Sequence, residues 1–311
     1  MILQDSFISI RDCPEPRRIM DSNPREPLFQ AAQPDDIMRE FTLALMSVAD
    51  GHWFPSGTAT IIGPRLAVTA KHMVEDYEER FGRCSVLAAN VLEGGTVGAL
   101  WSVSKCYSSP FTDIALLFLS HVKGSERAEN YDWAVCPMMN LAPPEVGSGV
   151  WGFGYPNSEV KHLISENEEP PSPTIRIKWS DRPSITTGTV IEVYFLRRDI
   201  SRMPFPGFQT NARFEGGMSG GPVFNENGEL CGIISSGFVF SEDGGPEATF
   251  VSSLWPLMGL QLDIPIQGNE SIDTYLLADL ANAKYIRTLN LNKVAIERNE
   301  DGSVNRVGFR K

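Results

Sequence analysis

Short β-prone runs, separated by Gly, Pro, Asp or His, dominate the chain from residue 42 onward. A helical turn is expected from His72 to Arg80, between the third and fourth of these runs. Strands this short and this closely spaced favour a small barrel. The first set of runs predicts six strands, at Leu43–Val48, Gly57–Ile62, Arg65–Thr69, Cys84–Leu92, Gly98–Cys106 and Asp113–Leu119.

A second series of strands follows a connector, residues 120–145, that contains three prolines. Residues 156–173 are rich in Glu and Pro, a composition typical of a mobile or lid-like loop. The predicted strands of this series lie at Gly149–Gly154, Thr174–Trp179, Ser184–Phe195, Gly207–Ala212, Gly221–Phe224, Glu229–Ser235 and Ala248–Ser252.

The two ends of the chain depart from this pattern. Pro, Arg and Asp are frequent near the N-terminus and predict an irregular extension with a helical turn near Asp36–Phe41. Apolar residues near one face predict a helix over Ser271–Arg287. Asp301-Gly302, between two β-prone runs, indicates a hairpin. Four regions are expected: 1–38 an N-terminal extension, 39–140 a first barrel, 141–260 a second barrel, and 261–311 a C-terminal helix and hairpin.

The composition fits a folded protein of strands and turns, and the net charge argues against one class of partner. Hydrophobic residues make up 42% of the 311 positions, and Gly (27) and Pro (22) are frequent. The formal net charge of −12 opposes contact with phosphate backbones, so no nucleic-acid partner is expected. Most of this acidity needs no explanation beyond solubility.

Five cysteines, an odd number without a CxxC spacing, argue against a disulfide framework or a zinc site. We expect buried free thiols in a reducing compartment. The first residues lack a basic start followed by an apolar stretch, and no run is long and apolar enough to span a membrane. The expectation is a cytoplasmic protein with no membrane partner, no metal and no cofactor.

The strongest chemical signal is the segment GGMSGGPV, from Gly216 to Val223. A serine hydroxyl is a weak nucleophile until a base removes its proton, and acyl transfer also needs donors for the developing oxyanion. Gly216 and Gly217 allow the backbone before Ser219 to turn its amides toward one point. Read alone, the segment is also compatible with a glycine-rich turn between two strands.

Two further residues complete a candidate triad. His72 follows the end of a predicted strand, where an imidazole can act as a general base, whereas His52, His121 and His162 lack such a setting. Asp113 opens an apolar strand, and a buried aspartate there needs a partner such as an imidazole N–H. The order His, Asp, Ser is one of the known triad orders, although a surface aspartate capping its strand is the plain alternative for Asp113.

These segments resemble those of trypsin-like peptidases, especially bacterial and HtrA-like members, over roughly residues 42–260. The stretches VWGFGYP, from Val150, and TGTV, from Thr187, are also similar. The resemblance implies an all-β fold of two antiparallel six-stranded barrels with the cleft between them. No PDZ module is expected, because the remaining tail is short for one.

The resemblance also implies roles for individual residues. His72 would be the general base, Asp113 would orient it and Ser219 would attack the carbonyl carbon, with the N–H groups of Gly217 and Ser219 as oxyanion hole. Met218 stands where digestive members carry an Asp that pairs with a newly cut N-terminus, so that mode of activation is not expected. Substrate backbone would pair with the strand edge formed by Ser235, Ser236 and Gly237.

Specificity and function leave alternatives open. Arg213 lies six residues before Ser219, where it could favour an acidic substrate side chain, or it could point outward and pair with Glu215. The sequence favours an endopeptidase acting on a protein or peptide substrate, with dedicated or gated proteolysis and a regulatory activator protein as a candidate partner. A peptide-binding module without catalysis and an esterase are the alternatives.

Overall fold

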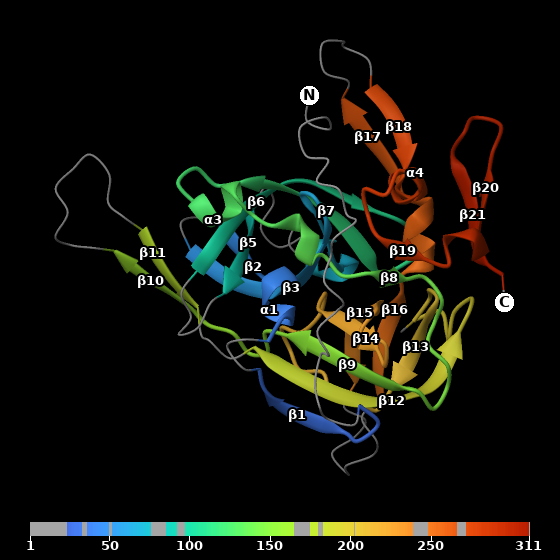
Figure 1. Cartoon of the computed structure of the whole chain (residues 1–311), viewed down its shortest axis with the longest axis horizontal. Helices are drawn as coiled ribbons and strands as arrows, with labels where there is room; N and C mark the ends of the chain where they lie inside the picture. Colours follow the sequence, from blue (N-terminus) through green and yellow to red (C-terminus); the bar gives the residue numbers. More distant parts are fainter. Residues whose placement is uncertain are drawn as a thin grey trace.

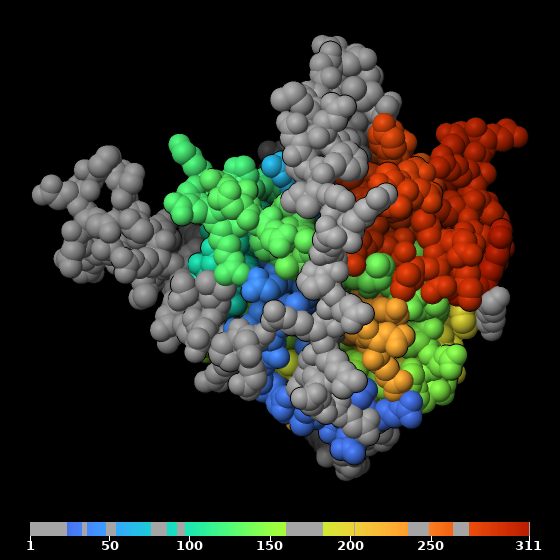
Figure 2. Space-filling model, in the orientation of Figure 1, coloured from blue at the N-terminus to red at the C-terminus, as the bar shows by residue number. Residues whose placement is uncertain are grey.

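The structure is a computed structural model of the 311-residue chain. Its description covers residues 24–32, 36–49, 52–75, 85–91, 97–164, 175–179, 183–201, 203–238, 248–265 and 272–310. Two barrels lie against each other, and the C-terminal residues form a lobe at their side (Figures 1 and 2).

The first barrel closes through six antiparallel strands in the order β2-β3-β4-β7-β6-β5. Its apolar residues form a core that is fully buried, with Leu43, Ile61 and Leu116 at 0% exposure. All six predicted strands are confirmed: β2 (Thr42–Ala49), β3 (His52–Gly63), β4 (Leu66–Ala70), β5 (Ser85–Val91), β6 (Val97–Ser108) and β7 (Ile114–His121).

The second barrel closes in the same way, because β14 pairs with β15 as well as with β9 and completes the ring β14-β9-β12-β13-β16-β15. The expected all-β fold of two six-stranded antiparallel barrels is therefore confirmed. The strands are β9 (Gly149–Gly154), β12 (Ser184–Tyr194), β13 (Gly207–Thr210), β14 (Pro222–Asn225), β15 (Leu230–Phe238) and β16 (Ala248–Ser253).

The N-terminal region contains a strand that its composition did not predict. β1 (Leu28–Ala31) pairs antiparallel with residues 184–187 of β12, and the helical turn α1 (Met38–Phe41) follows it as expected. Arg25 forms an ion pair with Glu226 at 2.7 Å, and Glu226 also accepts the Gly149 N–H at 3.0 Å. The segment is thereby fastened to the second barrel.

The connector between the barrels is tied to the C-terminal region. Its short strand β8 (Met139–Asn140) pairs in parallel with Leu230 of β15 and with β19 (Thr288–Leu289). The connector also contains α3 (Glu126–Glu129) and the 3₁₀ turn η3 (Trp133–Val135). β19 therefore extends the second barrel's sheet through the connector.

A hairpin leaves the second barrel between β9 and β12. It consists of β10 (Val160–Ile164) paired antiparallel with β11 (Ile175–Trp179), and it projects from the body at the left of Figure 1. The strand predicted at Thr174–Trp179 is confirmed, and the expected lid-like loop contains a strand at its start. Residues 165–174 lie outside the described part of the chain.

The helix predicted over Ser271–Arg287 is wrong for most of its length. Within its described part, only Leu277–Asn282 is helical, and residues 283–286 follow it as turns and bends. Ile272–Leu276 is a strand, β18, which pairs with β17 (Gln261–Pro265), and the helix α4 spans only Leu277–Asn282. The β-branched and aromatic residues in IDTYL suit a strand. Pairing with β17 therefore favoured the two-residue period of a strand over the 3.6-residue period of a helix. Lys284, at φ 61°, follows the helix in the left-handed region.

The expected C-terminal hairpin is confirmed. β20 (Val294–Arg298) pairs with β21 (Val304–Phe309), and Gly302 in the turn has φ 83°. The 3₁₀ turns η4 (Trp255–Gly259) and η5 (Leu291–Lys293) complete this region. Within the described residues, no helix is long and apolar enough to cross a membrane.

Three cysteines are described, and no disulfide is found at any of the three. Cys136 and Cys231 are buried and Cys106 is half-buried, as the sequence led us to expect. Burial raises the pKa of the Cys231 thiol well above its usual range. Cys13 and Cys84 lie outside the described residues.

Candidate active site

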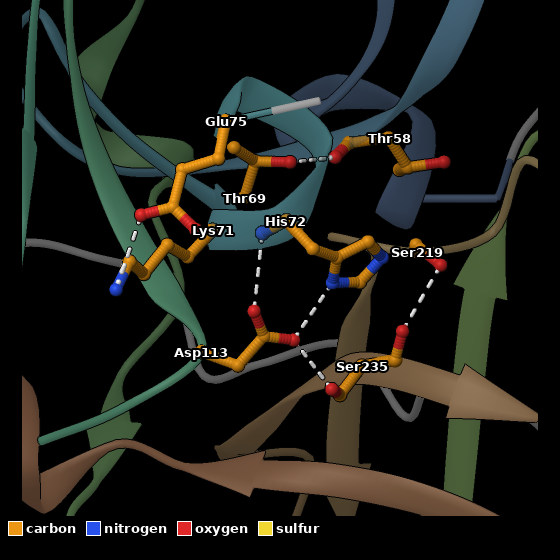
Figure 3. Close-up of polar contacts among 8 residues, drawn as sticks. All are labelled: Thr58, Thr69, Lys71, His72, Glu75, Asp113, Ser219 and Ser235. Carbon is orange, nitrogen blue, oxygen red and sulfur yellow. Dashed lines mark hydrogen bonds and ion pairs between the residues drawn. The ribbon is translucent and has the colours of Figure 1, made fainter. Parts of the chain in front are cut away.

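His72 lies two residues past the end of a barrel strand. β4 ends at Ala70, and a helical turn over residues 71–75 begins directly after it. Lys71 forms an i,i+4 ion pair with Glu75 at 3.1 Å along this turn (Figure 3). Its backbone N–H donates to the Asp113 carbonyl oxygen at 2.8 Å. The turn is thereby fixed to the start of β7, which brings the imidazole to the carboxylate.

Asp113 lies directly before β7, and its carboxylate accepts hydrogen bonds from His72 and Ser235. Its Oδ1 accepts the backbone N–H of His72 at 3.1 Å, and its Oδ2 lies 2.8 Å from His72 Nδ1. The Ser235 hydroxyl also donates to Oδ2, at 2.5 Å. The Asp113 side chain is 11% exposed, so this carboxylate is buried but well supplied with donors.

Ser219 lies between the two barrels, facing this pair. Its Oγ donates to the Ser235 carbonyl oxygen at 3.1 Å, and its own carbonyl oxygen accepts the Thr58 N–H at 2.9 Å. Figure 3 shows the second ring nitrogen of His72 directed toward the Ser219 side chain. The structure thus brings the three predicted triad residues together, with Ser235 bridging two of them.

The residues before Ser219 form a tight turn. Met218 N–H donates to the Glu215 carbonyl oxygen at 3.1 Å, and Gly217 has φ 94°. A Cβ at Gly217 would also lie 2.5 Å from the Tyr155 carbonyl oxygen, so only glycine fits. In the described part of the chain, the N–H groups of Gly217 and Ser219 donate to no acceptor.

The two glycines after Ser219 are required by close packing of the strands. A Cβ at Gly220 would lie 2.0 Å from the Thr58 carbonyl oxygen, and one at Gly221 would lie 2.1 Å from the Phe153 carbonyl oxygen. These positions are filled by neighbouring strands, including one of the first barrel. Close strand packing therefore requires both glycines in this conformation, without any substrate.

The predicted substrate edge lies on β15. Ser236 and Gly237 pair with Phe250 and Thr249 of β16, whereas the pairing with β14 reaches only as far as Ile233. Among the described strands, none pairs with the other side of β15 at Ser236 and Gly237. Ser235 has a second task that the sequence did not predict, since its hydroxyl contacts Asp113.

Arg213 is paired within the chain. Its guanidinium lies 2.6 Å from the Glu215 carboxylate and over the Phe29 ring of β1, 5.2 Å from the ring centroid. The side chain is 58% exposed. Arg213 thus adopts the alternative in which it points outward and pairs with Glu215. Contact of Arg213 with a substrate side chain stays a prediction.

Thr58 and Asn157 contact the turn that residues 215–218 form before Ser219, and sequence reasoning gave neither a role. The Thr58 hydroxyl donates to the Gly217 carbonyl oxygen at 2.8 Å across the barrel interface. Asn157 N–H donates to the Gly216 carbonyl oxygen at 2.8 Å, with the backbone of Asn157 in the left-handed region. The only local signal was the turn-forming character of Asn157 after Pro156.

Titratable and metal-binding groups do not suggest a metal centre. Across the described residues, His, Cys, Asp and Glu side chains form no group of three that could hold a metal ion. The chemical groups that meet at this site are the His72 imidazole, the Asp113 carboxylate, the hydroxyls of Ser219 and Ser235, and backbone amides.

Comparison with known families identifies the class. The sequence matches the family model of the trypsin-like peptidase domain over residues 57–233, more than half of the chain. The chain therefore belongs to the trypsin-like peptidases and is a serine endopeptidase, a hydrolase. A search of curated protein sequences found no match.

Solved structures include similar chains at low identity. The active form of the Rv3671c protease from M. tuberculosis has 19% identity and a TM-score of 0.45, covering 76% of this chain and 89% of that chain. Deg5 has 18% identity and a TM-score of 0.42, covering 68% of this chain and 83% of that chain. The family assignment rests on the sequence match.

Proposed function

We propose that the chain cleaves peptide bonds of a protein substrate through an acyl-enzyme, with Ser219 as nucleophile, His72 as general base and Asp113 as its orienting partner. The observation that carries the proposal is the 2.8 Å contact between His72 Nδ1 and Asp113 Oδ2. A proton on Nδ1 shared with this carboxylate leaves Nε2 as an acceptor, which is the tautomer that a general base needs.

The reaction follows from these contacts. The Ser219 side chain first rotates, so that its hydroxyl no longer donates to the Ser235 carbonyl oxygen and donates to the His72 imidazole instead. His72 Nε2 takes the proton while Oγ bonds to the substrate carbonyl carbon, and the carbonyl oxygen becomes negative. His72 then gives the proton to the leaving amine, and water releases the acyl group by the same route.

The oxyanion is the second part of the proposal. The N–H groups of Gly217 and Ser219 donate to no acceptor in the described residues, and Gly217 is held at a positive φ. Two such donors aimed at the developing charge are the largest single contribution in many acyl-transfer enzymes. Their availability supports their assignment as the oxyanion hole.

Substrate backbone would bind along β15. The strand edge at Ser236 and Gly237 has unpaired groups among the described strands, and an extended peptide can add there as a further strand. Ser235 would then contribute its carbonyl oxygen, which Ser219 occupies in the present conformation. This arrangement favours proteins and peptides over small esters.

We also propose dedicated or gated proteolysis in the cytoplasm, with an activator protein as a candidate partner. Buried Met218, in place of a charged residue, supports activity without a newly cut N-terminus. The three described cysteines form no disulfide, which supports a reducing compartment. Constitutive cleavage in such a compartment would harm the cell, which favours a restricted substrate.

The proposal is tested by mapping new N-termini in a cell lysate treated with the wild-type chain or with Ser219→Ala. We expect cleavage products with the wild type alone, and a faster reaction with peptides than with simple esters. Peptide binding without cleavage would favour the binding module instead. Turnover of esters alone would favour the esterase.

A further inference from the structure

Residues 215–218 form the turn before Ser219, here called the nucleophile turn. The carbonyl groups of Gly216, Gly217 and Met218 in this turn each accept a hydrogen bond from another part of the chain. Asn157 N–H donates to Gly216 O at 2.8 Å, Thr58 Oγ1 donates to Gly217 O at 2.8 Å, and Gly221 N–H donates to Met218 O at 2.9 Å. Because the C=O and N–H of a trans peptide point in opposite directions, each bond also sets the direction of the following amide.

The peptide between Gly216 and Gly217 is the variable one. The bond from Met218 N–H to Glu215 O closes a four-residue turn, and φ 94° at its third residue, Gly217, is the value of a type II turn. In a type I turn the same central peptide is reversed, and the Gly217 N–H points to the opposite side. Glycine at 217 accepts both states, and the bond from Asn157 N–H to Gly216 O holds the observed one.

Asn157 is itself held by charged neighbours. Its Nδ2 donates to Glu215 Oε2 at 3.1 Å, and Glu215 Oε1 lies 2.6 Å from the Arg213 guanidinium. Its φ of 45° lies in the left-handed region, which Asn tolerates better than most residues. The side chain therefore steadies the backbone N–H that Gly216 accepts.

Thr58 acts on the neighbouring peptide from the first barrel. It is fully buried in β3, and its hydroxyl accepts the Tyr155 N–H at 3.2 Å while donating to Gly217 O. Its own N–H donates to the Ser219 carbonyl oxygen at 2.9 Å. One residue of the first barrel thus fixes two carbonyls on either side of Met218 in the second.

We propose that Asn157 and Thr58 are positioning residues with separate tasks. Asn157 holds the peptide that carries the Gly217 N–H so that this N–H faces the Ser219 hydroxyl, and Thr58 holds the Gly217 and Ser219 carbonyl groups and so places the turn beside Ser219. The inference rests on the proposed function and adds residues outside the triad to it. The oxyanion hole is then preformed by hydrogen bonds that cross the interface between the barrels. Neither residue touches the reacting atoms.

The first test measures labelling of Ser219 by a fluorophosphonate, separating the rate constant of reaction from the affinity of the probe. Thr58→Val keeps the shape of the side chain and removes the hydroxyl. We expect a reaction rate constant lower by about tenfold or more, toward the 10² to 10³ lost with one oxyanion donor, at nearly unchanged probe affinity. Thr58→Ser restores the hydroxyl and should recover most of the rate.

The matched control is Thr60→Val. Thr60 is equally buried two residues further along β3, but its hydroxyl donates to the Gly220 carbonyl oxygen at 3.4 Å. That carbonyl follows Ser219 and belongs to neither peptide that carries a proposed oxyanion N–H. The same chemical change should leave the labelling rate near that of the wild type. Equal losses in Thr58→Val and Thr60→Val would overturn the positioning role and indicate a packing effect.

The second test uses Asn157, and it decides the matter if Thr58→Val does not fold. Asn157→Gly keeps the left-handed backbone and its N–H, whereas Asn157→Ala disfavours that conformation. We expect labelling about tenfold slower in the Ala variant than in the Gly variant, with similar melting temperatures. Equal rates in both would contradict the inference while leaving the proposed function intact. A wild-type chain that fails to label would instead overturn the proposed function.

Discussion

Asp113 holds His72 at two points, with Oδ1 on the backbone N–H at 3.1 Å and Oδ2 on Nδ1 at 2.8 Å. The first contact fixes the start of the helical turn, and the second fixes the rotation of the ring. A carboxylate that only neutralised the imidazolium would need the second contact alone. The pair therefore sets position and tautomer together.

Asp113→Asn should lower turnover by about 10⁴-fold, since the amide favours the wrong imidazole tautomer while keeping the shape of the site. The measurement is kcat on any peptide substrate that the wild type cleaves. Ser235→Ala is the comparison, because it removes a donor to Asp113 Oδ2 without removing the acceptor of His72. A smaller loss in Asp113→Asn than in Ser235→Ala would contradict this account.

Gly217→Ala should abolish most activity in a folded protein, whereas Gly216→Ala should not. A Cβ at Gly217 would lie 2.5 Å from the Tyr155 carbonyl oxygen and would be strained at φ 94°, so the turn is expected to reverse its central peptide. A Cβ at Gly216 has only the Asn157 side chain within 4 Å, at 3.8 Å. Circular dichroism and fluorophosphonate labelling of both variants check this, and equal labelling would count against the oxyanion assignment.

Met218→Asp should destabilise the chain by about 3 kcal/mol or more, because it buries an unpaired carboxylate. Met218 is fully buried, and its Sδ accepts the Glu215 N–H at 3.5 Å. Met218→Leu, a change of similar volume, should cost less than about 1.5 kcal/mol. Urea unfolding measures both, and equal stabilities would mean that the carboxylate finds a cation.

The Arg25–Glu226 pair should make stability depend on pH. The Arg25 guanidinium and the Gly149 N–H lower the pKa of the Glu226 carboxyl below its usual range. A lowered pKa contributes stability above the pKa of the unfolded chain, about 4.3, and the contribution is lost as pH falls through the folded value. The wild type should therefore melt above Glu226→Gln at pH 7, with the difference shrinking toward pH 3. A difference that grows on acidification would contradict this sign.

The barrels were predictable because their strands are short, apolar and bounded by turn residues. β9, for example, has the bounds that the sequence predicts, Gly149–Gly154. β1 was missed because LFQA is too short to show alternation, and only its pairing with β12 makes it a strand. The helix expected over Ser271–Arg287 failed for a related reason, since pairing with β17 outweighed the helical period.

At the site, the meeting of His72, Asp113 and Ser219 was predictable because each stands in a segment with its own local signal. Thr58 carries no such signal, because a buried threonine in a strand looks the same whether or not its hydroxyl crosses to another barrel. The arrangement of Arg213 with Glu215 and Phe29 depends on β1, which the sequence did not predict. Contacts between distant segments therefore account for what the sequence could not reveal.

The most direct test of the triad is the mass of the chain after reaction with a fluorophosphonate, followed by peptide mapping of the adduct. The account predicts one adduct per chain on Ser219, none in Ser219→Ala, and labelling slower by about 10³-fold or more in His72→Ala. An adduct on another residue, or equally fast labelling of Ser219 without His72, would contradict the claim that these residues act as one catalytic unit.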